Sequence, residues 1–314
     1  MAEKLFDFYL RVDLKNNMFV INHKKIFFIF SAIVVIASIL SIIFYGLNFS
    51  IDFTGGSIVE VEYLSERPDQ KTIEAQIDSL GIGESLVQTS GEHGYIIRTR
   101  ALTETEHPKL LSSLSIGGTY ELEEKRFNTI GPTIGTELRK KAWIAIIVVI
   151  VAIILFIAFA FRKVSHPVSS WKYGLIAIVA LIHDIIVPAG VFAFLGSKFM
   201  EYQIDILFVM ALLAILGFSV NDTIVVFDRI RENLRINREY RHREEFSETV
   251  GKSLQQTYAR SLNTSLTTLA VLVALYFFGG ESTQQFALVL SIGVVAGTYS
   301  SIFLASPLLV VAQK

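Results

Sequence analysis

The stretch DILFVMALLAILGFSVNDTIVVF, residues 205–227, decides the class of this chain. It is a run of mostly apolar residues long enough to cross a hydrocarbon core, which takes about 20 residues of helix. It nevertheless holds Asn221, Asp222 and Thr223 in the part that would lie in lipid. An ionisable group there is costly, and by default it indicates function. The stretch therefore predicts a membrane helix that carries a carboxylate with a functional role.

Five further stretches share this length and apolar composition. The six predicted membrane spans are 26–46, 142–161, 173–195, 205–227, 262–278 and 285–311. The whole 314-residue chain agrees, because 52 % of its residues are hydrophobic and 18 % are charged, against about 45–50 % and about 25 % in soluble domains. The absence of cysteine excludes disulfides, thiolate metal sites and cysteine nucleophiles. The net charge of −1 gives no bulk attraction to nucleic acid.

Lysine and arginine beside the spans predict the orientation, because these residues gather on the cytoplasmic side. Segments 1–25, 162–172 and 228–261 carry five, three and eight of them, and the opposite loops 196–204 and 279–284 carry one and none. We therefore expect the N-terminal segment and the C-terminus to be cytoplasmic. Residues 47–141 would then lie outside the membrane on the other side.

Residues 47–141 mix strand and helix signals, unlike the rest of the chain. Strand patterns cover 57–63, 84–89, 94–100 and 119–127, and helical spacing covers 69–80 and 104–114. The resulting order is β-α-β-β-α-β, which is the ferredoxin-like order. We expect a six-helix membrane protein with one α+β domain between its first two spans.

Asp222 is the strongest candidate for a group that binds and releases a proton within a helical bundle. The alternative is a structural carboxylate that is hydrogen-bonded to neighbouring helices and fixes their packing. Arg260 stands at the mouth of the fifth span and is the natural partner for a carboxylate on a neighbouring helix. Ser261, Thr264, Ser265 and Thr268 follow it at helical spacing and predict a polar face. Asp228 lies near the end of the fourth span, where it either titrates or anchors the helix at the headgroups.

His183 and Asp184 are adjacent inside the third span. Neighbouring residues on a helix point about 100° apart, so the two do not face one ligand, and we expect no metal site. They serve either a proton path or a buried polar contact between helices.

Glycines in two settings are predicted to shape the backbone. Gly293 and Gly297 in the sixth span form a GxxxG pattern that permits close helix packing. The other glycines flank the α+β domain and are predicted hinges: Gly55 and Gly56 in DFTGGS (52–57), and Gly131 and Gly135 in GPTIGTEL (131–138).

The order of these motifs resembles the SecD/SecF family of bacterial protein-export membrane proteins, part of the resistance-nodulation-division superfamily. The resemblance covers nearly the whole chain and rests on DFTGGS, GPTIGTEL, HD (183–184), GFSVNDTIVVFDRIREN (217–233), RSLNTSLTT (260–268), FGG (278–280) and GTYSSIFLASP (297–307). It implies a subunit of the bacterial cytoplasmic membrane that is not an enzyme and needs no cofactor besides protons. It also implies pairing with SecD and association with the SecYEG channel and often with YajC. The implied role is to assist preprotein translocation after SecA-driven export.

The matching motifs imply a proton-coupling role for Asp222 and Arg260, and leave open whether Asp222 or Asp228 is the main titrating group. Two other classes stay open from the sequence. One is a half-transporter of the same superfamily for a small molecule or lipid, although its outer domains are usually larger and occur twice. The other is a scaffold subunit that transports nothing.

Overall fold

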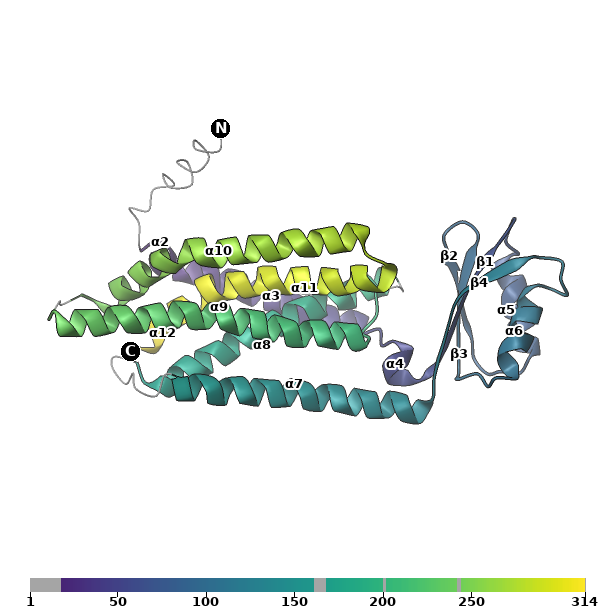
Figure 1. Cartoon of the computed structure of the whole chain (residues 1–314), viewed down its shortest axis with the longest axis horizontal. Helices are drawn as coiled ribbons and strands as arrows, with labels where there is room; N and C mark the ends of the chain where they lie inside the picture. Colours follow the sequence, from purple (N-terminus) through teal and green to yellow (C-terminus); the bar gives the residue numbers. More distant parts are fainter. Residues whose placement is uncertain (1–17, 161–167, 200–201, 242–243, 314) are drawn as a thin grey trace, which may run out of the picture. The chain divides into compact units, whose positions relative to one another are not determined.

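The computed structural model describes residues 18–160, 168–199, 202–241 and 244–313. The predicted segment 1–25, the end of the span 142–161, and the loops 162–172, 196–204 and 228–261 therefore lie partly outside the described residues. The chain divides into two compact units. One is an α+β domain of residues Phe49–Ile144, and the other is a bundle of long helices (Figure 1).

The bundle holds, within the described residues, six helices long and apolar enough to cross a membrane, which confirms the predicted number. A short helix α2 (Phe19–Asn22) precedes them. The long helices are α3 (Lys24–Tyr45), α7 (Pro132–Ala160), α8 (Ser170–Lys198), α9 (Ile206–Glu239), α10 (Phe246–Phe278) and α11 (Glu281–Tyr299). The last one continues through a π-helical turn, η1 (Ser300–Ala305), into α12 (Ser306–Ala312).

Several helices run further than the apolar stretches that predicted them. Helix α9 starts where its stretch starts, because the Asp205 carboxylate accepts a hydrogen bond from the Phe208 N–H at 2.7 Å. It continues to Glu239, whereas the apolar stretch ends at residue 227. Hydropathy marks only the length suited to lipid, and the helix goes on for as long as its backbone hydrogen bonds are made.

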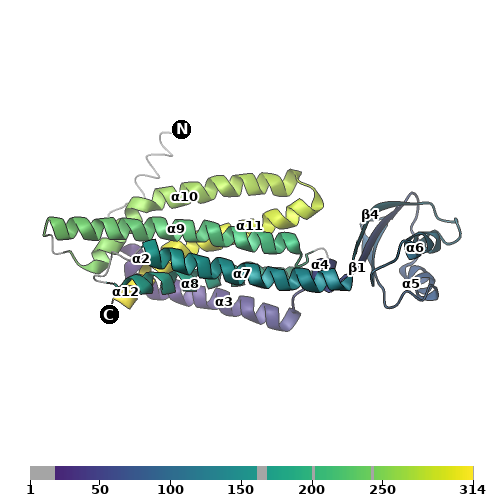
Figure 2. The same cartoon turned by 60° about the horizontal axis from the view of Figure 1, so that its bottom comes forward.

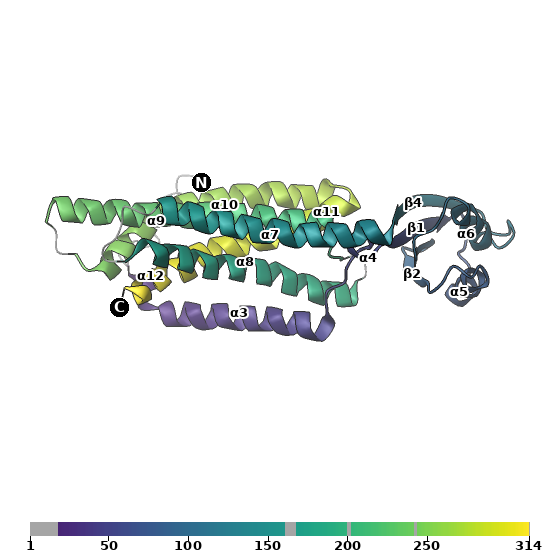
Figure 3. The same cartoon turned by 90° about the horizontal axis from the view of Figure 1, so that it is seen from below.

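The centre of the bundle consists of α8, α9 and the last span. Helix α11 contacts α8, α9 and α10, and η1 contacts α3, α8 and α9 (Figure 3). About half of the most apolar window of α8 and α9 is buried, against 11 % for α3, 6 % for α7 and 17 % for α10. The three outer helices thus leave apolar surface uncovered along most of their length, as membrane helices facing lipid do. Figure 2 shows α3 and α10 on opposite sides of the bundle.

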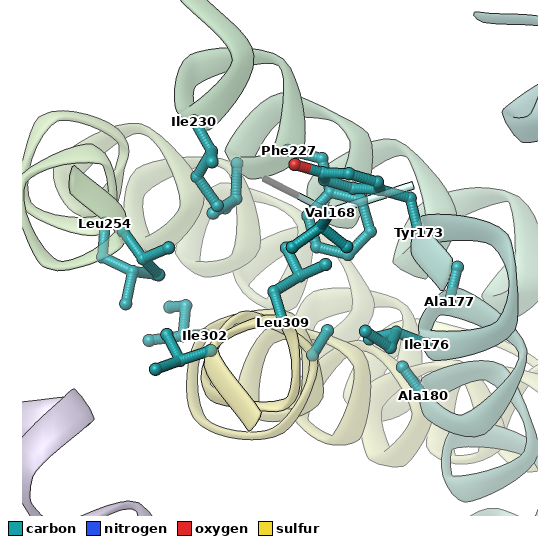
Figure 4. Close-up of a cluster of buried hydrophobic side chains, with 14 of the residues drawn as sticks. Val168, Tyr173, Ile176, Ala177, Ala180, Phe227, Ile230, Leu254, Ile302 and Leu309 are labelled. Atoms are coloured by element: carbon teal, nitrogen blue, oxygen red, sulfur yellow. The ribbon is translucent and has the colours of Figure 1, made fainter. Parts of the chain in front are cut away.

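A cluster of buried apolar side chains joins α8, α9, α10 and the last span (Figure 4). The Tyr173 and Phe227 rings meet edge to face with centroids 5.2 Å apart. Ile230, Ile302 and Leu309 pack in the same cluster. The π turn is therefore held on this side by dry packing.

The α+β unit begins with a short helix α4 (Ile51–Thr54). Its strands and helices follow in the order β1 (Gly56–Tyr63), α5 (Gln70–Ser79), β2 (Leu86–Ser90), β3 (Gly94–Thr99), α6 (Glu106–Leu114) and β4 (Leu122–Ile130). All neighbouring strands are antiparallel in the spatial order β2-β3-β1-β4, and α5 and α6 cover one face (Figure 1). The predicted ferredoxin-like arrangement is confirmed.

The core of this unit lies between the sheet and the two helices. Ile73, Ile77, Ile97 and Leu114 are fully buried there. The Tyr63 hydroxyl donates to the Leu114 carbonyl at 3.0 Å. Burial is the main reason that the pKa of Tyr63 is raised above its ordinary value.

The last strand is displaced from its predicted range of 119–127 to Leu122–Ile130. The chain between α6 and β4 makes a turn in which Ile116 has φ 48° and Gly117 and Gly118 also have positive φ. The Tyr120 N–H still bonds back to the Ser115 carbonyl at 3.0 Å, so the strand cannot begin before it. β propensity alone did not reveal this turn.

Candidate functional site

Asp222 lies half-buried on α9 and receives hydrogen bonds from two other elements. The Ser261 hydroxyl of α10 donates to its Oδ1 at 2.5 Å. The Ser301 hydroxyl of η1 donates to its Oδ2. Of its sequence neighbours, Thr223 is buried and Asn221 is exposed. The carboxylate therefore ties three membrane helices together at one point.

Asp184 forms a second carboxylate centre on α8 and is fully buried. It accepts hydrogen bonds from the His183 Nδ1 at 2.8 Å, from the Ser219 hydroxyl of α9, and from the Ser300 hydroxyl of η1 at 2.8 Å. His183 thus contacts its own neighbour, and its ring lies beside the ring of Tyr299 with centroids 6.0 Å apart.

The π turn connects the two carboxylates, because consecutive residues serve them. Ser300 donates to Asp184 and Ser301 donates to Asp222. Successive helical side chains point about 100° apart, which lets one turn reach α8 on one side and α9 on the other. π-helical turns inside α-helices are frequent at functional sites.

The polar face predicted on α10 is only partly as expected. Ser265 is buried and its hydroxyl lies 2.5 Å from that of Thr298 on α11. Thr264 is exposed and Thr268 partly so, and the Thr268 hydroxyl bonds back to the Thr264 carbonyl. The buried face instead follows four-residue steps through Thr249, Ser253, Thr257, Ser261 and Ser265.

Arg260 and Asp228 lie away from the buried carboxylates. Arg260 is exposed on α10 and, in the part of the chain that the structure describes, makes no ion pair with Asp222. Asp228 pairs with Arg231 on its own helix at 2.6 Å and is also exposed. The expected Asp222–Arg260 contact is therefore absent from this structure, because neighbouring Ser261, one helical position on, points inward in place of Arg260.

Neither Asp184 nor Asp222 has a lysine or arginine beside it. Among the described residues, no lysine or arginine nitrogen lies within 4.0 Å of Asp184 or Asp222, and their partners are hydroxyls and one imidazole. The described residues also contain no cluster of three metal-ligating side chains.

The pairing of these serines with the two carboxylates was not predicted from the sequence. Ser219 lies three residues before Asp222, and Ser300 and Ser301 follow the glycine pattern of the last span. Serine is common in membrane helices as a packing residue, so its presence alone did not indicate a partner. Spacing along the chain gave no signal for these pairs, because Ser300 and Ser301 lie on a different helix from either carboxylate, and Ser219 bonds to Asp184 rather than to Asp222 on its own helix.

Glycines bring the last span close to α9. A Cβ atom at Gly293 would lie 2.2 Å from the Ile215 side chain, and one at Gly297 would lie 3.0 Å from the Ser219 Cβ. Gly297 therefore lets α11 approach the helix face that carries both Ser219 and Asp222.

The glycines predicted as hinges lie in the α+β unit, and three of them are close backbone contacts. A Cβ atom at Gly55, whose φ is +72°, would lie 2.8 Å from the Pro132 Cα. A Cβ at Gly135 would lie 2.7 Å from the Gly55 nitrogen, and one at Gly56 would lie 2.7 Å from the Thr99 oxygen. Gly131 has open space around it. The two glycine motifs thus meet, and their role as hinges stays a prediction.

Two family models match this chain. The model described as protein export membrane protein SecD/SecF, C-terminal, matches residues 112–314. The model described as the SecD/SecF GG motif matches residues 40–63, which include Gly55 and Gly56.

Whole-chain relatives carry the same name. The protein translocase subunit SecF of Thermobaculum terrenum is 42 % identical over 306 residues, covering 93 % of this chain and 92 % of the relative. That of Anaerolinea thermophila is 36 % identical over 297 residues, covering 94 % of each.

The crystal structure of SecDF from Thermus thermophilus, described as a translocon-associated membrane protein, is similar with a TM-score of 0.77 and 31 % identity. A super-membrane-facing form of SecDF gives a TM-score of 0.61 and 30 % identity. These matches cover 93 % and 95 % of this chain but 38 % of the SecDF chains, so this chain spans well under half of SecDF. Its composition, its six membrane helices and these matches together place this chain in the SecD/SecF family of protein-export membrane proteins, among the SecF subunits.

Proposed function

We propose that this subunit uses the proton motive force to assist preprotein translocation across the bacterial cytoplasmic membrane, after SecA has driven the preprotein into the channel. It would act with SecD beside SecYEG, often with YajC. Both termini would be cytoplasmic and residues 47–141 would lie on the outer side. The observation that supports this most is Asp222, a carboxylate that joins three apolar helices through hydroxyls alone.

The proposed coupling step is the protonation of Asp222. As an anion it accepts hydrogen bonds from both Ser261 and Ser301. Protonation removes the charge and weakens both bonds, because hydrogen bonds to an ionised group are roughly twice as strong as neutral ones. Helices α9, α10 and the π turn can then repack. Arg260 stands one residue from Ser261, so in this proposal it pairs with a carboxylate only in a second state of the complex.

The energy available per proton sets how sharply such a step can switch. A membrane potential of 100 mV supplies about 2.3 kcal/mol per charge. One unit of pH difference adds about 1.4 kcal/mol. Reversing a two-state equilibrium from 1:99 to 99:1 takes about 5.5 kcal/mol. One proton therefore biases the bundle without reversing it fully, and we expect export to rise gradually with the gradient.

The test is gradient-driven export into inverted vesicles that contain the complex with SecD. Asp222→Asn should keep the assembled complex but abolish the stimulation by a proton gradient. Asp228→Asn is the matched control, because Asp228 is exposed and paired with Arg231, and its stimulation should persist. Unchanged stimulation in Asp222→Asn would reject the role of Asp222. If the wild-type complex stimulates export equally with and without a proton gradient, the subunit acts as a scaffold and not through protons.

A further inference from the structure

Asp184 is a buried titratable group that the proposed coupling step does not use. It is 0 % exposed and accepts three hydrogen bonds, from His183, Ser219 and Ser300. Any buried carboxylate needs hydrogen-bond donors, and these could all lie on its own helix. Its donors instead come from its own helix, from α9 and from η1, so it fixes the π turn against both neighbouring helices.

The π turn gives each of its serines a choice of two acceptors. The Ser300 hydroxyl donates to Asp184 and also lies 3.1 Å from the Gly297 carbonyl. The Ser301 hydroxyl donates to Asp222 and also lies 3.1 Å from the Thr298 carbonyl. A hydroxyl has one proton, so the orientation of the turn and the charge on each carboxylate decide which acceptor it favours.

We propose that Asp184 is a positioning residue of the proton-binding site: by holding Ser300, it keeps the π turn in the orientation that aims the Ser301 hydroxyl at Asp222. This inference rests on the proposed function of Asp222. Because Ser300 and Ser301 are consecutive, a turn that loses its hold on Asp184 also changes the direction of the next side chain. Ser301 then returns to the Thr298 carbonyl, and Asp222 loses one of its two donors.

The side chains around Asp184 and Asp222 limit which other groups could set the orientation of the π turn. The titratable side chains beside it are His183 on α8 and Tyr299 at the end of α11, whereas Arg260 lies on the exposed side of α10. The Tyr299 hydroxyl is itself committed to α3, where it donates to the Phe27 carbonyl at 3.0 Å and accepts from Ser31 at 3.2 Å. Among the described residues, Asp184 is the carboxylate that accepts a hydrogen bond from Ser300, the residue of the π turn just before Ser301.

The test is the infrared band of the protonated Asp222 carboxyl in the purified complex with SecD, identified by its loss in Asp222→Asn. Ser301→Ala should move this band to higher wavenumber, because a carbonyl that loses a hydrogen bond vibrates faster. Ser300→Ala and Asp184→Asn, which do not touch Asp222, should move it in the same direction. They should also displace the pH profile of gradient-driven export.

Two controls separate positioning from general damage. Ser300→Thr keeps a hydroxyl at the same position and should restore the wild-type band. Ser291→Ala removes a hydroxyl of α11 that bonds only to its own helix, at the Ala287 carbonyl, and should leave the band in place.

The proposal is overturned if Ser301→Ala moves the band while Ser300→Ala and Asp184→Asn leave both the band and the pH profile unchanged. It is equally overturned if Ser301→Ala has no effect. Failure of the proposed function looks different, because then no protonated carboxyl band disappears in Asp222→Asn at any pH.

Discussion

Carboxylates have different partners in the two units of this molecule. In the α+β unit, Glu106 is paired with Arg100 at 2.5 Å and Glu124 with His107 at 2.8 Å, and these groups are partly or largely open to water. In the bundle, Asp184 and Asp222 are held by hydroxyls and one imidazole. The partly exposed Glu106 thus pairs with a guanidinium, as Asp228 does on the exposed side of α9, whereas among the described residues no lysine or arginine pairs with Asp184 or Asp222. This difference is the ground on which we propose Asp222, rather than a carboxylate of the α+β unit, as the proton-binding group.

The largest expected effect is on the core of the α+β unit. Leu114→Ala should lower its free energy of unfolding by about 2–5 kcal/mol, because Leu114 is fully buried and the substitution leaves a cavity. Hydrogen exchange on the intact chain should rise over residues 56–130 and stay unchanged in α8 and α9. Leu64→Ala, at a residue 67 % exposed, is the control. Equal increases in both units would show that they do not unfold separately.

The next effect concerns the packing of α3 on α8. A Cβ atom at Gly190 would lie 2.4 Å from the Ser38 Cα, which is backbone and cannot move aside. Gly190→Ala should cost about 1–3 kcal/mol, as overpacking typically does, and should lower the unfolding temperature of the purified chain in detergent. Gly174→Ala on the same helix meets nothing within 4 Å and should not. Equal behaviour of the two variants would contradict the helix contact.

The smallest effect is a pH dependence in the α+β unit. The hydrogen bond from Arg100, followed by those from Thr103, lowers the pKa of Glu106 from 4.5 to about 2. A lowered carboxyl pKa stabilises the fold above the ordinary value, and this stabilisation is lost as the pH falls toward the folded-state value. Glu106→Gln should therefore be cut faster than wild type by pepsin near α6 at pH about 5 and equally fast at about 2.

The control for this prediction is Glu104→Gln, at an exposed carboxylate two residues earlier. Its cleavage rate should follow that of the wild type across the same range. A Glu106→Gln rate that differs from the wild type by the same factor at both pH values would mean that the Arg100 contact does not depend on the charge of Glu106.

The sequence predicted the fold better than the site, for physical reasons that particular residues illustrate. Six apolar runs and a β-α-β-β-α-β pattern reflect burial, which each residue reports locally through its own hydrophobicity. The turn at Ile116–Gly118 shifted β4, because a positive φ at a non-glycine residue leaves no clear signal in the sequence.

The site depends on contacts between distant residues, and these were predicted unevenly. The role given to Asp222 stays a prediction, and its partners in the structure are Ser261 and Ser301 rather than Arg260. Arg260 was expected as the partner because an acidic side chain in a membrane span commonly pairs with a basic one. The structure shows which side of α10 faces inward. The sequence could not show this, because the predicted polar face of α10 contains both buried and exposed hydroxyls.

The most direct measurement of the central claim is the protonation of Asp222 itself. Infrared difference spectra of the purified complex with SecD, taken as the pH is lowered, should show a protonated carboxyl band that vanishes in Asp222→Asn and persists in Asp228→Asn. That result would establish the buried carboxylate of α9 as the group that takes up the proton. A band that survives in Asp222→Asn and disappears in Asp228→Asn would contradict the account.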